Sequence, residues 1–282
     1  MKKAVQQFML GSVFKSESSV KSTLAAMKAA GYDGIELCGF MLHPMGFMIR
    51  MLTRAAGMPV GSGGNLEWEK LIKESGLNVV SIHQDLGSIE RDPAAAAAEA
   101  KRFGTDTVVI TGMYRYDYSS ESAVRALAQR LNKAGEALRK EGVSLLYHNH
   151  NCEFLRVAPG VNGYGLLLAE TDPEAVNFEF DSYWCAECGA DPLRVMDALG
   201  PRMKLWHIND RGTRQSGPSM TPILKSDSME LGTGAMPLDA LWDRAKEAGV
   251  EAVILESHRN WVDKSPIKSL QVSAQWLKNK QD

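Results

Sequence analysis

Short apolar runs and longer amphipathic segments alternate along this chain from one end to the other. The apolar runs have the length of strands, and they lack the strict polar alternation of a half-buried sheet. They therefore predict strands that are buried on both faces, as in parallel sheets. Eight such runs are present, at residues 4–10, 33–37, 78–83, 107–111, the start of 143–154, 176–181, 203–208 and 252–256.

The segments between these runs carry the signals of helices. Apolar residues recur at helical spacing, and Gly31, Gly76, Gly104 and Gly142 stand where four of the segments should end. A long loop rich in Met and Gly, residues 43–64, fits no clean period and holds a helical stretch at 48–56. The predicted helices are residues 16–30, 67–74, 93–103, 120–140, 163–170, 192–199, 238–248 and 267–280.

Eight strand–helix units in 282 residues predict an α/β fold, a single (β/α)8 TIM barrel. We expect one domain over residues 1–282, because no linker or shift in composition divides the chain. The alternative is a doubly wound open sheet. The glycine fingerprint GxGxxG is missing after the first strand, which removes the best support for a dinucleotide-binding version of that sheet.

Composition limits the classes of function. The chain is 44% hydrophobic and 23% charged with a net charge of -2, which argues against nucleic acid or an anionic membrane as partner. No apolar stretch reaches transmembrane length, and the N-terminal apolar run is short for a signal peptide, so we expect a cytoplasmic protein. Four cysteines in a chain of this length predict no disulfide framework, and Cys185 and Cys188 are interpreted as reduced and packed.

Polar side chains gather where the predicted strands end. Residues 143–154 pass abruptly from an apolar run into two histidines, two asparagines and a carboxylate. Five of the six histidines stand at or just beyond a strand end, and in a barrel those ends meet at one mouth. Imidazoles and carboxylates without thiolate indicate a divalent ion such as Mn, Mg, Co or Zn, whereas a hydrogen-bonded cluster without metal is the plainer alternative. The set is Glu36, His83, His148, His150, Asp181, His207, Asp210, Glu256 and His258.

Four motifs carry a resemblance to a known family. Residues 31–37 (GYDGIEL), 147–154 (YHNHNCEF), 178–184 (FEFDSYW) and 205–210 (LWHIND) resemble the sugar phosphate isomerase/epimerase family of xylose isomerase-like TIM barrels. The similarity runs nearly end to end and is specific to the superfamily, but it does not identify the substrate. The chain departs from many relatives at Asn209, where they carry lysine.

The resemblance implies one metal ion, Mn being favoured, held by strands five to eight. On the fifth strand we favour His148 as ligand, with Glu153 as the alternative. The implied metal ligands are His148, Asp181, His207 and Glu256. The implied catalytic residues are Glu153, His150 and Glu256, and the candidate substrate contacts are Glu36, His83, Trp184 and Arg211.

This ligand set suits removal of the proton α to a carbonyl, with the resulting enediolate stabilised by the metal. We therefore expect an isomerase or epimerase acting on a keto-sugar or sugar derivative, without a phosphate cradle. An inosose-type dehydratase that uses the same enolate is the main alternative. An endonuclease of the endonuclease IV kind and a sugar-binding barrel without catalysis are weaker ones. The expected partner is a small carbohydrate, and a homo-oligomer is left open.

Overall fold

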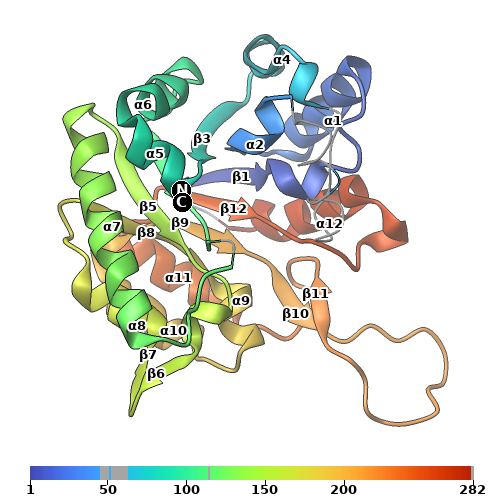
Figure 1. Ribbon diagram of the computed structural model, residues 1–282. Helices are drawn as coiled ribbons and strands as arrows, with labels where there is room; N and C mark the ends of the chain where they lie inside the picture. Colours follow the sequence, from blue (N-terminus) through green and yellow to red (C-terminus); the bar gives the residue numbers. More distant parts are fainter. Residues whose placement is uncertain (45–50, 52–62, 114, 281–282) are drawn as a thin grey trace.

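Eight parallel strands close into a barrel (Figure 1). The structure is a computed structural model, and it describes residues 1–44, 51, 63–113 and 115–280. Around the barrel the strand order is β1-β12-β9-β8-β5-β4-β3-β2, and every neighbouring pair is parallel. The predicted TIM barrel is confirmed. The strands are β1 (Lys2–Gln6), β2 (Gly34–Cys38), β3 (Asn78–His83), β4 (Thr107–Ile110), β5 (Ser144–His148), β8 (Val176–Asp181), β9 (Met203–Ile208) and β12 (Ala252–Leu255).

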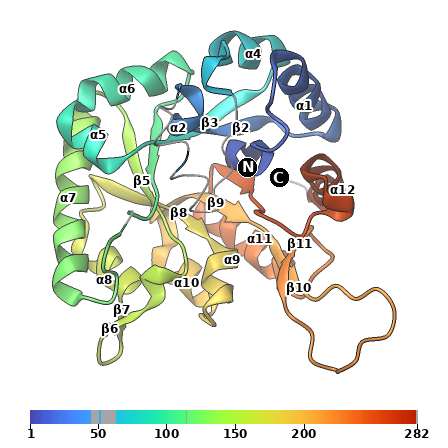
Figure 2. The same cartoon turned by 45° about the vertical axis from the view of Figure 1, so that its right-hand side comes forward.

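Helices surround this barrel on all sides (Figure 2). Their starts follow local chemistry: at the first long helix, Ser16 and Ser19 form a reciprocal capping box. Gly31 ends that helix with a φ of 99°, a conformation that favours glycine. The main helices are α1 (Glu17–Ala30), α4 (Trp68–Ser75), α6 (Pro93–Arg102), α7 (Glu121–Lys140), α8 (Gly163–Glu170), α10 (Pro192–Leu199), α11 (Leu238–Ala248) and α12 (Pro266–Lys278).

The structure corrects one boundary and adds short elements. The predicted strand 4–10 is wrong beyond Gln6, because the Gln6 side chain accepts a hydrogen bond from the Phe8 backbone and starts a 3-10 turn, η1 (Gln7–Leu10). The other additions are too short to show a period in the sequence. They are α2 (Gly39–Leu42), η2 (Gly63–Asn65), α5 (Leu86–Arg91), η3 (Cys152–Phe154), β6 (Arg156–Ala158), β7 (Val161–Asn162), α9 (Ser182–Glu187), η4 (Gly200–Arg202), β10 (Asp210–Gly212), β11 (Asp227–Met229) and η5 (Val262–Lys264).

Three further expectations concern the stretch 48–56, the cysteines and membrane-spanning segments. The helical stretch expected at 48–56 lies outside the described residues except for Met51, which is helical and exposed. All four cysteines are free, as predicted. Within the described part of the chain, every helix is too short or too polar to span a bilayer.

A plug of apolar side chains fills the middle of the barrel. Its members are Ala4, Val80, Val109, Leu146, Leu205, Ala252 and Ile254, and all are buried. Side chains two residues apart on a strand share a face. The residues that follow this plug by two positions on β5, β9 and β12 are His148, His207 and Glu256. A polar layer therefore lies directly above the apolar one, at the carboxyl ends of the strands.

Candidate active site

Four of the predicted residues meet at the mouth of the barrel. His148 ends β5, Asp181 ends β8, His207 lies on β9, and Glu256 directly follows β12. Each offers one ligand atom, these atoms lie within 4.8 Å of one another, and all four residues are buried. The structure thus brings together the whole set assigned to a metal ion, and their binding of an ion stays a prediction.

Asn149 explains how two of these strand ends are held in place. Its side-chain oxygen accepts from the Asp181 backbone N–H at 2.9 Å, and its amide donates to the Asp181 carbonyl oxygen at 3.1 Å. Asn149 is fully buried, so this pair of hydrogen bonds extends the β5–β8 pairing by one residue. The asparagine between the two histidines is therefore a clamp that fixes the spacing of His148 and Asp181.

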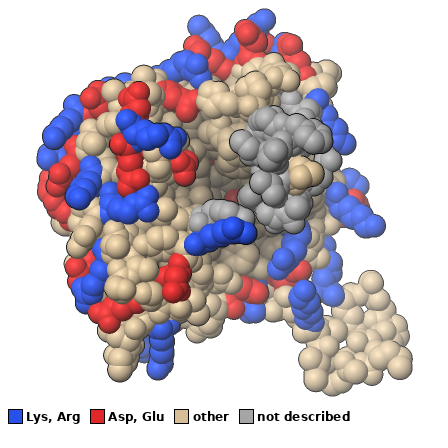
Figure 3. All heavy atoms as spheres, in the orientation of Figure 1, with Lys and Arg blue, Asp and Glu red and all other residues tan. Residues whose placement is uncertain are grey.

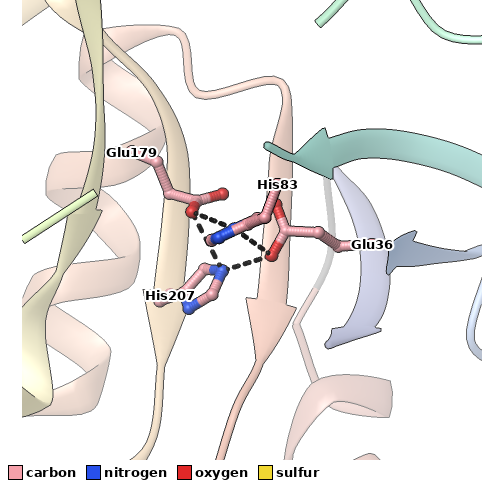
Figure 4. Close-up of side chains that lie close together, drawn as sticks. All are labelled: Glu36, His83, Glu179 and His207. Carbon is pink, nitrogen blue, oxygen red and sulfur yellow. Dashed lines mark hydrogen bonds and ion pairs between the residues drawn. The ribbon is translucent and has the colours of Figure 1, made fainter. Parts of the chain in front are cut away.

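A second group of imidazoles and carboxylates lies beside the first and shares His207 (Figure 4). Nε2 of His207 is 2.6 Å from Glu36 Oε2 and 3.2 Å from Glu179 Oε2. Nε2 of His83 is 3.1 Å from the same two oxygens. The sequence interpretation omitted Glu179 because it lies inside a strand. The signal was there, since Glu179 is two residues before Asp181 and therefore faces the same side of β8.

Charges in this second group stabilise one another. Burial alone would lower the pKa of His83, but the carboxylates of Glu36 and Glu179 outweigh it and raise that pKa to about 10. Burial also opposes protonation of His207, and again these carboxylates prevail, so its pKa lies well above the usual value. Burial would raise the pKa of Glu179, yet His207 and His148 hold it well below the usual range. His83 and His207 are therefore positively charged near neutral pH.

The imidazoles of His148 and His150 have lowered pKa values instead. Burial, reinforced by the positive charge of His207, lowers the pKa of His148 to about 4. Burial, reinforced by His148, lowers the pKa of His150 to about 4. Both rings are neutral at pH 7, so each keeps a nitrogen lone pair for a cation or a proton.

The two carboxyl groups near these rings also differ. Burial raises the pKa of Asp181 to about 8, and the neighbouring Glu256 carboxylate adds to the rise against the opposing charge of His207. For Glu256 burial acts in the same direction, but nearby imidazoles outweigh it and hold its pKa below the usual range. A buried acid whose pKa is raised this far is destabilised as an anion, and a divalent cation would relieve that cost.

A cavity opens above the polar layer. It is lined by His83, His148, His150, Trp184 and Glu256, among others. The Trp184 ring lies between two imidazoles, with centroid distances of 5.8 Å to His150 and 5.6 Å to His258. Trp184 thus forms an aromatic wall of the cavity, in the position from which a substrate contact was predicted.

Five of the predicted site residues do not line this cavity, and two of them, Asp181 and His207, are buried candidate ligands. Glu36 is fully buried below it. Arg211 donates from Nε to Glu187 Oε2 at 2.6 Å, on α9. Glu153 is also fully buried. The residues at the strand ends that reach the cavity are therefore His83, His148 and Glu256, with His150 just beyond. The substrate roles of Glu36 and Arg211 stay predictions.

Both carboxylate oxygens of Glu153 accept hydrogen bonds from β5 or from the turn that follows it. Oε1 accepts from the Tyr147 hydroxyl at 2.8 Å. Oε2 accepts from the His150 backbone N–H at 2.9 Å and from the Cys152 thiol at 3.2 Å. These bonds fix the turn that presents His150 to the cavity. The structure therefore places Glu153 as a support for His150, and its role in proton transfer stays a prediction.

The donor set at the mouth fits a divalent metal ion. It consists of two imidazoles and two carboxylates, the ligands that Mn, Co, Zn and related ions take from proteins. One buried polar atom beside it, Glu179 Oε1, has no hydrogen-bond partner among the described residues. Such orphaned atoms are rare in folded proteins, and this one indicates a group that completes the site.

Comparison with known proteins places this barrel in a family. The model of the family described as xylose isomerase-like TIM barrel matches residues 24–280. The chain belongs to the xylose isomerase-like TIM barrel family. The predicted resemblance is confirmed at this level.

The relatives share this fold and differ in their reactions. Inosose dehydratase of Lacticaseibacillus casei is 23% identical over 150 residues, 50% of this chain and 49% of that protein. The chain thus aligns with about half the length of that curated relative. A sugar phosphate isomerase/epimerase structure from Parabacteroides distasonis ATCC 8503 has a TM-score of 0.77 at 21% identity over 99% of each chain. A structure of the IOLI protein with a zinc atom has a TM-score of 0.67 at 14% identity, covering 98% of this chain and 96% of that one.

The described charged side chains on one face of the molecule are of both signs (Figure 3). On the face shown in Figure 3, positive and negative side chains are interspersed around a central hollow. A nucleic-acid site usually gathers Lys and Arg in one stripe. Together with the net charge of -2, this mixture favours a small-molecule substrate.

Proposed function

We propose that this protein is a divalent-cation-dependent isomerase or epimerase that acts on a keto-sugar or a related sugar derivative. One observation carries the proposal: His148, Asp181, His207 and Glu256, from four adjacent strands, present ligand atoms within 4.8 Å of one another. His148 and Glu256 of this set also line the cavity. Structural similarity to a sugar phosphate isomerase/epimerase supports the reaction class.

The bound cation would act as a Lewis acid that polarises a substrate carbonyl and so acidifies the neighbouring C–H bond. Mn is our preferred ion for these nitrogen and oxygen ligands, with Mg, Co and Zn as alternatives. The side chains around the ion would bind the substrate and exclude water. Trp184 forms a wall against which a sugar ring can pack. The buried strand ends keep water out of the lower part of the site.

Proton transfer is assigned to Glu256 and His150, which line the cavity and are unprotonated at neutral pH. Glu256 has a lowered pKa and is a carboxylate at neutral pH, so it accepts a proton from the carbon next to the carbonyl. His150 has a pKa of about 4 and is also able to accept one. In an isomerase or epimerase the proton then returns to a neighbouring carbon or to the other face of the same carbon.

The alternative function is an inosose-type dehydratase, a lyase. It needs only one proton acceptor, and the lowered pKa values of Glu256 and His150 leave either group able to take that role. A group that has just taken the α-proton can hand it to a hydroxyl that leaves as water, with no second donor required. Similarity to inosose dehydratase over half the chain adds to this candidate.

Metal content is the first test of the proposal. Purified wild-type protein and Asp181→Ala are loaded with Mn, desalted and subjected to elemental analysis. We expect about one ion per wild-type chain and a loss of at least tenfold in affinity for the variant, since one of four ligands is removed. No bound ion in either protein would contradict the proposal.

The reaction itself is tested in deuterated water. Wild type is incubated with a panel of keto-sugars, keto-glycosides and inososes, and the products are followed by NMR. Deuterium incorporation without loss of water identifies an isomerase or epimerase, and loss of water identifies a dehydratase. Asp181→Ala is the control, and its activity should fall by a factor of roughly 10³ because it lacks a ligand of the ion.

A further inference from the structure

His207 is in contact with carboxylates through both of its ring nitrogens. Nδ1 lies 3.0 Å from Glu256 Oε2, on the side of the candidate metal ligands. Nε2 lies 2.6 Å from Glu36 Oε2, on the opposite side of the ring. His207 is protonated in the free site, so a cation must displace one of its two N–H protons. The ring that remains has a lone pair on one nitrogen only. The shorter contact, between Nε2 and Glu36, retains its proton, so Nδ1 is the nitrogen left for the cation.

Neighbouring side chains hold the Glu36 carboxylate in its position next to His207 Nε2. Its Oε2 also accepts from Gln6 Nε2 at 2.5 Å, and its Oε1 accepts from the Ser81 hydroxyl at 2.5 Å. The side chain is fully buried and does not line the cavity. Because residues on β1 and β3 hold the Glu36 carboxylate, its oxygen stays directed toward His207 on β9 (Figure 4).

Glu179 stands in the same relation to the other histidine of the set. Its Oε2 is 3.1 Å from His148 Nδ1, a buried nitrogen with no other partner in the described chain. The same oxygen accepts from His83 Nε2 at 3.1 Å. Strand pairing sets this arrangement, because His148 on β5 is directly opposite Glu179 on β8.

The lower group could also be considered a second cation site, since its four ligand atoms converge. Its distances argue against that. Two ligand atoms each about 2.0–2.2 Å from one ion, at a right angle or wider, stand roughly 3 Å apart or more. Glu36 Oε2 and His207 Nε2 are 2.6 Å apart, which is the length of a charge-assisted hydrogen bond.

We propose that Glu36 and Glu179 are positioning residues for the candidate metal site. Glu36 takes the Nε2–H of His207 and leaves Nδ1 for the cation, and Glu179 takes the Nδ1–H of His148 and leaves Nε2. Carboxylates behind ligand histidines fix the tautomer and raise the basicity of the ring in this way. The inference rests on the proposed function, because it presupposes that the site binds a cation.

The test compares Glu36→Gln and Glu179→Gln with wild type by calorimetric titration of Mn and Zn. Glu230→Gln is the control, because Glu230 is a buried carboxylate that contacts Ser269 and Arg214 instead of a candidate ligand. We expect cation affinity to fall about 10- to 100-fold in each of the first two variants and to stay unchanged in the control.

A spectroscopic measurement separates positioning from general loss of structure. In Zn-loaded protein with 15N-labelled histidine, long-range 1H–15N spectra report the tautomer of each ring. We expect His207 to carry its proton on Nε2 in wild type, and this signal to change in Glu36→Gln but not in Glu230→Gln. If the tautomers and the cation affinity are unchanged in both Glu36→Gln and Glu179→Gln, the inference is overturned while the proposed function stands. Two ions per wild-type chain would also overturn it, since Glu36 would then be a ligand. Absence of any bound ion in wild type would instead contradict the proposed function.

Discussion

Two regions of this barrel bury carboxylates, and they use them in different ways. At the mouth, Glu256 and Asp181 lie beside the imidazole of His207, and Asp181 also accepts a hydrogen bond from the Trp184 backbone N–H at 2.8 Å. At the base of the loop that follows β9, Asp210 faces only backbone N–H groups. Its Oδ1 accepts from Arg211 and Met236 at 2.8 and 3.1 Å, and its Oδ2 accepts from Gly232 and Gly234 at 3.1 and 2.9 Å.

The difference lies in the donors. A backbone N–H keeps its proton, so the carboxylate of Asp210 stays bound to four fixed partners and holds the ends of a loop together. An imidazole can give up a proton, so Glu256 and Asp181 beside His207 keep the option of binding a cation instead. Carboxylates of the same chemistry thus anchor a loop in one region and form a candidate ligand set in the other.

The largest expected effect that tests this comparison comes from Asp210→Ala. Removing the carboxylate leaves four N–H groups without their acceptor, and at about 1–3 kcal/mol for each group that water does not reach, we expect a loss of about 4 kcal/mol in the free energy of unfolding. Urea unfolding measures this loss. Asp181→Ala is the matched comparison, and it should lose cation binding with a smaller loss of stability, because it leaves one backbone N–H, that of Trp184, without its acceptor instead of four.

Cation binding by Asp210→Ala gives the reciprocal result. The folded fraction should bind one ion per chain with an affinity close to that of wild type. A variant of Asp210 that is stable but cannot bind the ion would show that Asp210 belongs to the mouth, and the distinction between the two regions would be wrong.

Glu153 is the intermediate case, because it accepts from one backbone N–H, that of His150, and from the side chains of Tyr147 and Cys152. We expect Glu153→Gln to lose about 1–2 kcal/mol of stability, since Gln cannot accept from both Tyr147 and the His150 backbone as the carboxylate does. Turnover should fall about tenfold through displacement of His150. Tyr147→Phe removes one of these bonds and should reproduce part of the loss in stability. A 1,000-fold loss of turnover at unchanged stability would assign proton transfer to Glu153 itself.

Four of the residues that the sequence singled out lie together at the mouth, and the reason is physical. His148, Asp181, His207 and Glu256 each lie at or near the end of a predicted strand, and in a parallel barrel such ends meet at one place. Glu179 escaped prediction because it lies within a strand, between two buried aromatics, where only the two-residue period reveals its face. Its partner His83 is 96 residues away, so no local pattern joins them.

The loop after β9 shows the limit of the same reasoning. Asp210 and Arg211 follow the strand just as Glu256 does, so their position alone favoured the site. The chain turns there into the short hairpin of β10 and β11, which was too short to predict, and Arg211 is carried to Glu187 instead. The end of a strand thus indicates a candidate, and the next few residues decide whether it stays at the mouth.

The smallest expected effect concerns the pH dependence of the loop base. Burial would raise the pKa of Glu230, but the Ser269 hydroxyl and then Arg214 outweigh it, so this pKa is lowered in the folded protein. Its ordinary value is about 4.3. A lowered folded-state pKa adds stability above that value, and this stability is lost as the pH falls through the folded-state pKa. We expect Glu230→Gln to be less stable than wild type by about 1 kcal/mol at pH 6, and the difference to shrink below pH 4. Thermal unfolding of both proteins across this range measures it. A difference that stays constant with pH would mean that Glu230 acts through packing alone, and then the loop base would owe its stability to Asp210 rather than to a pair of charged anchors.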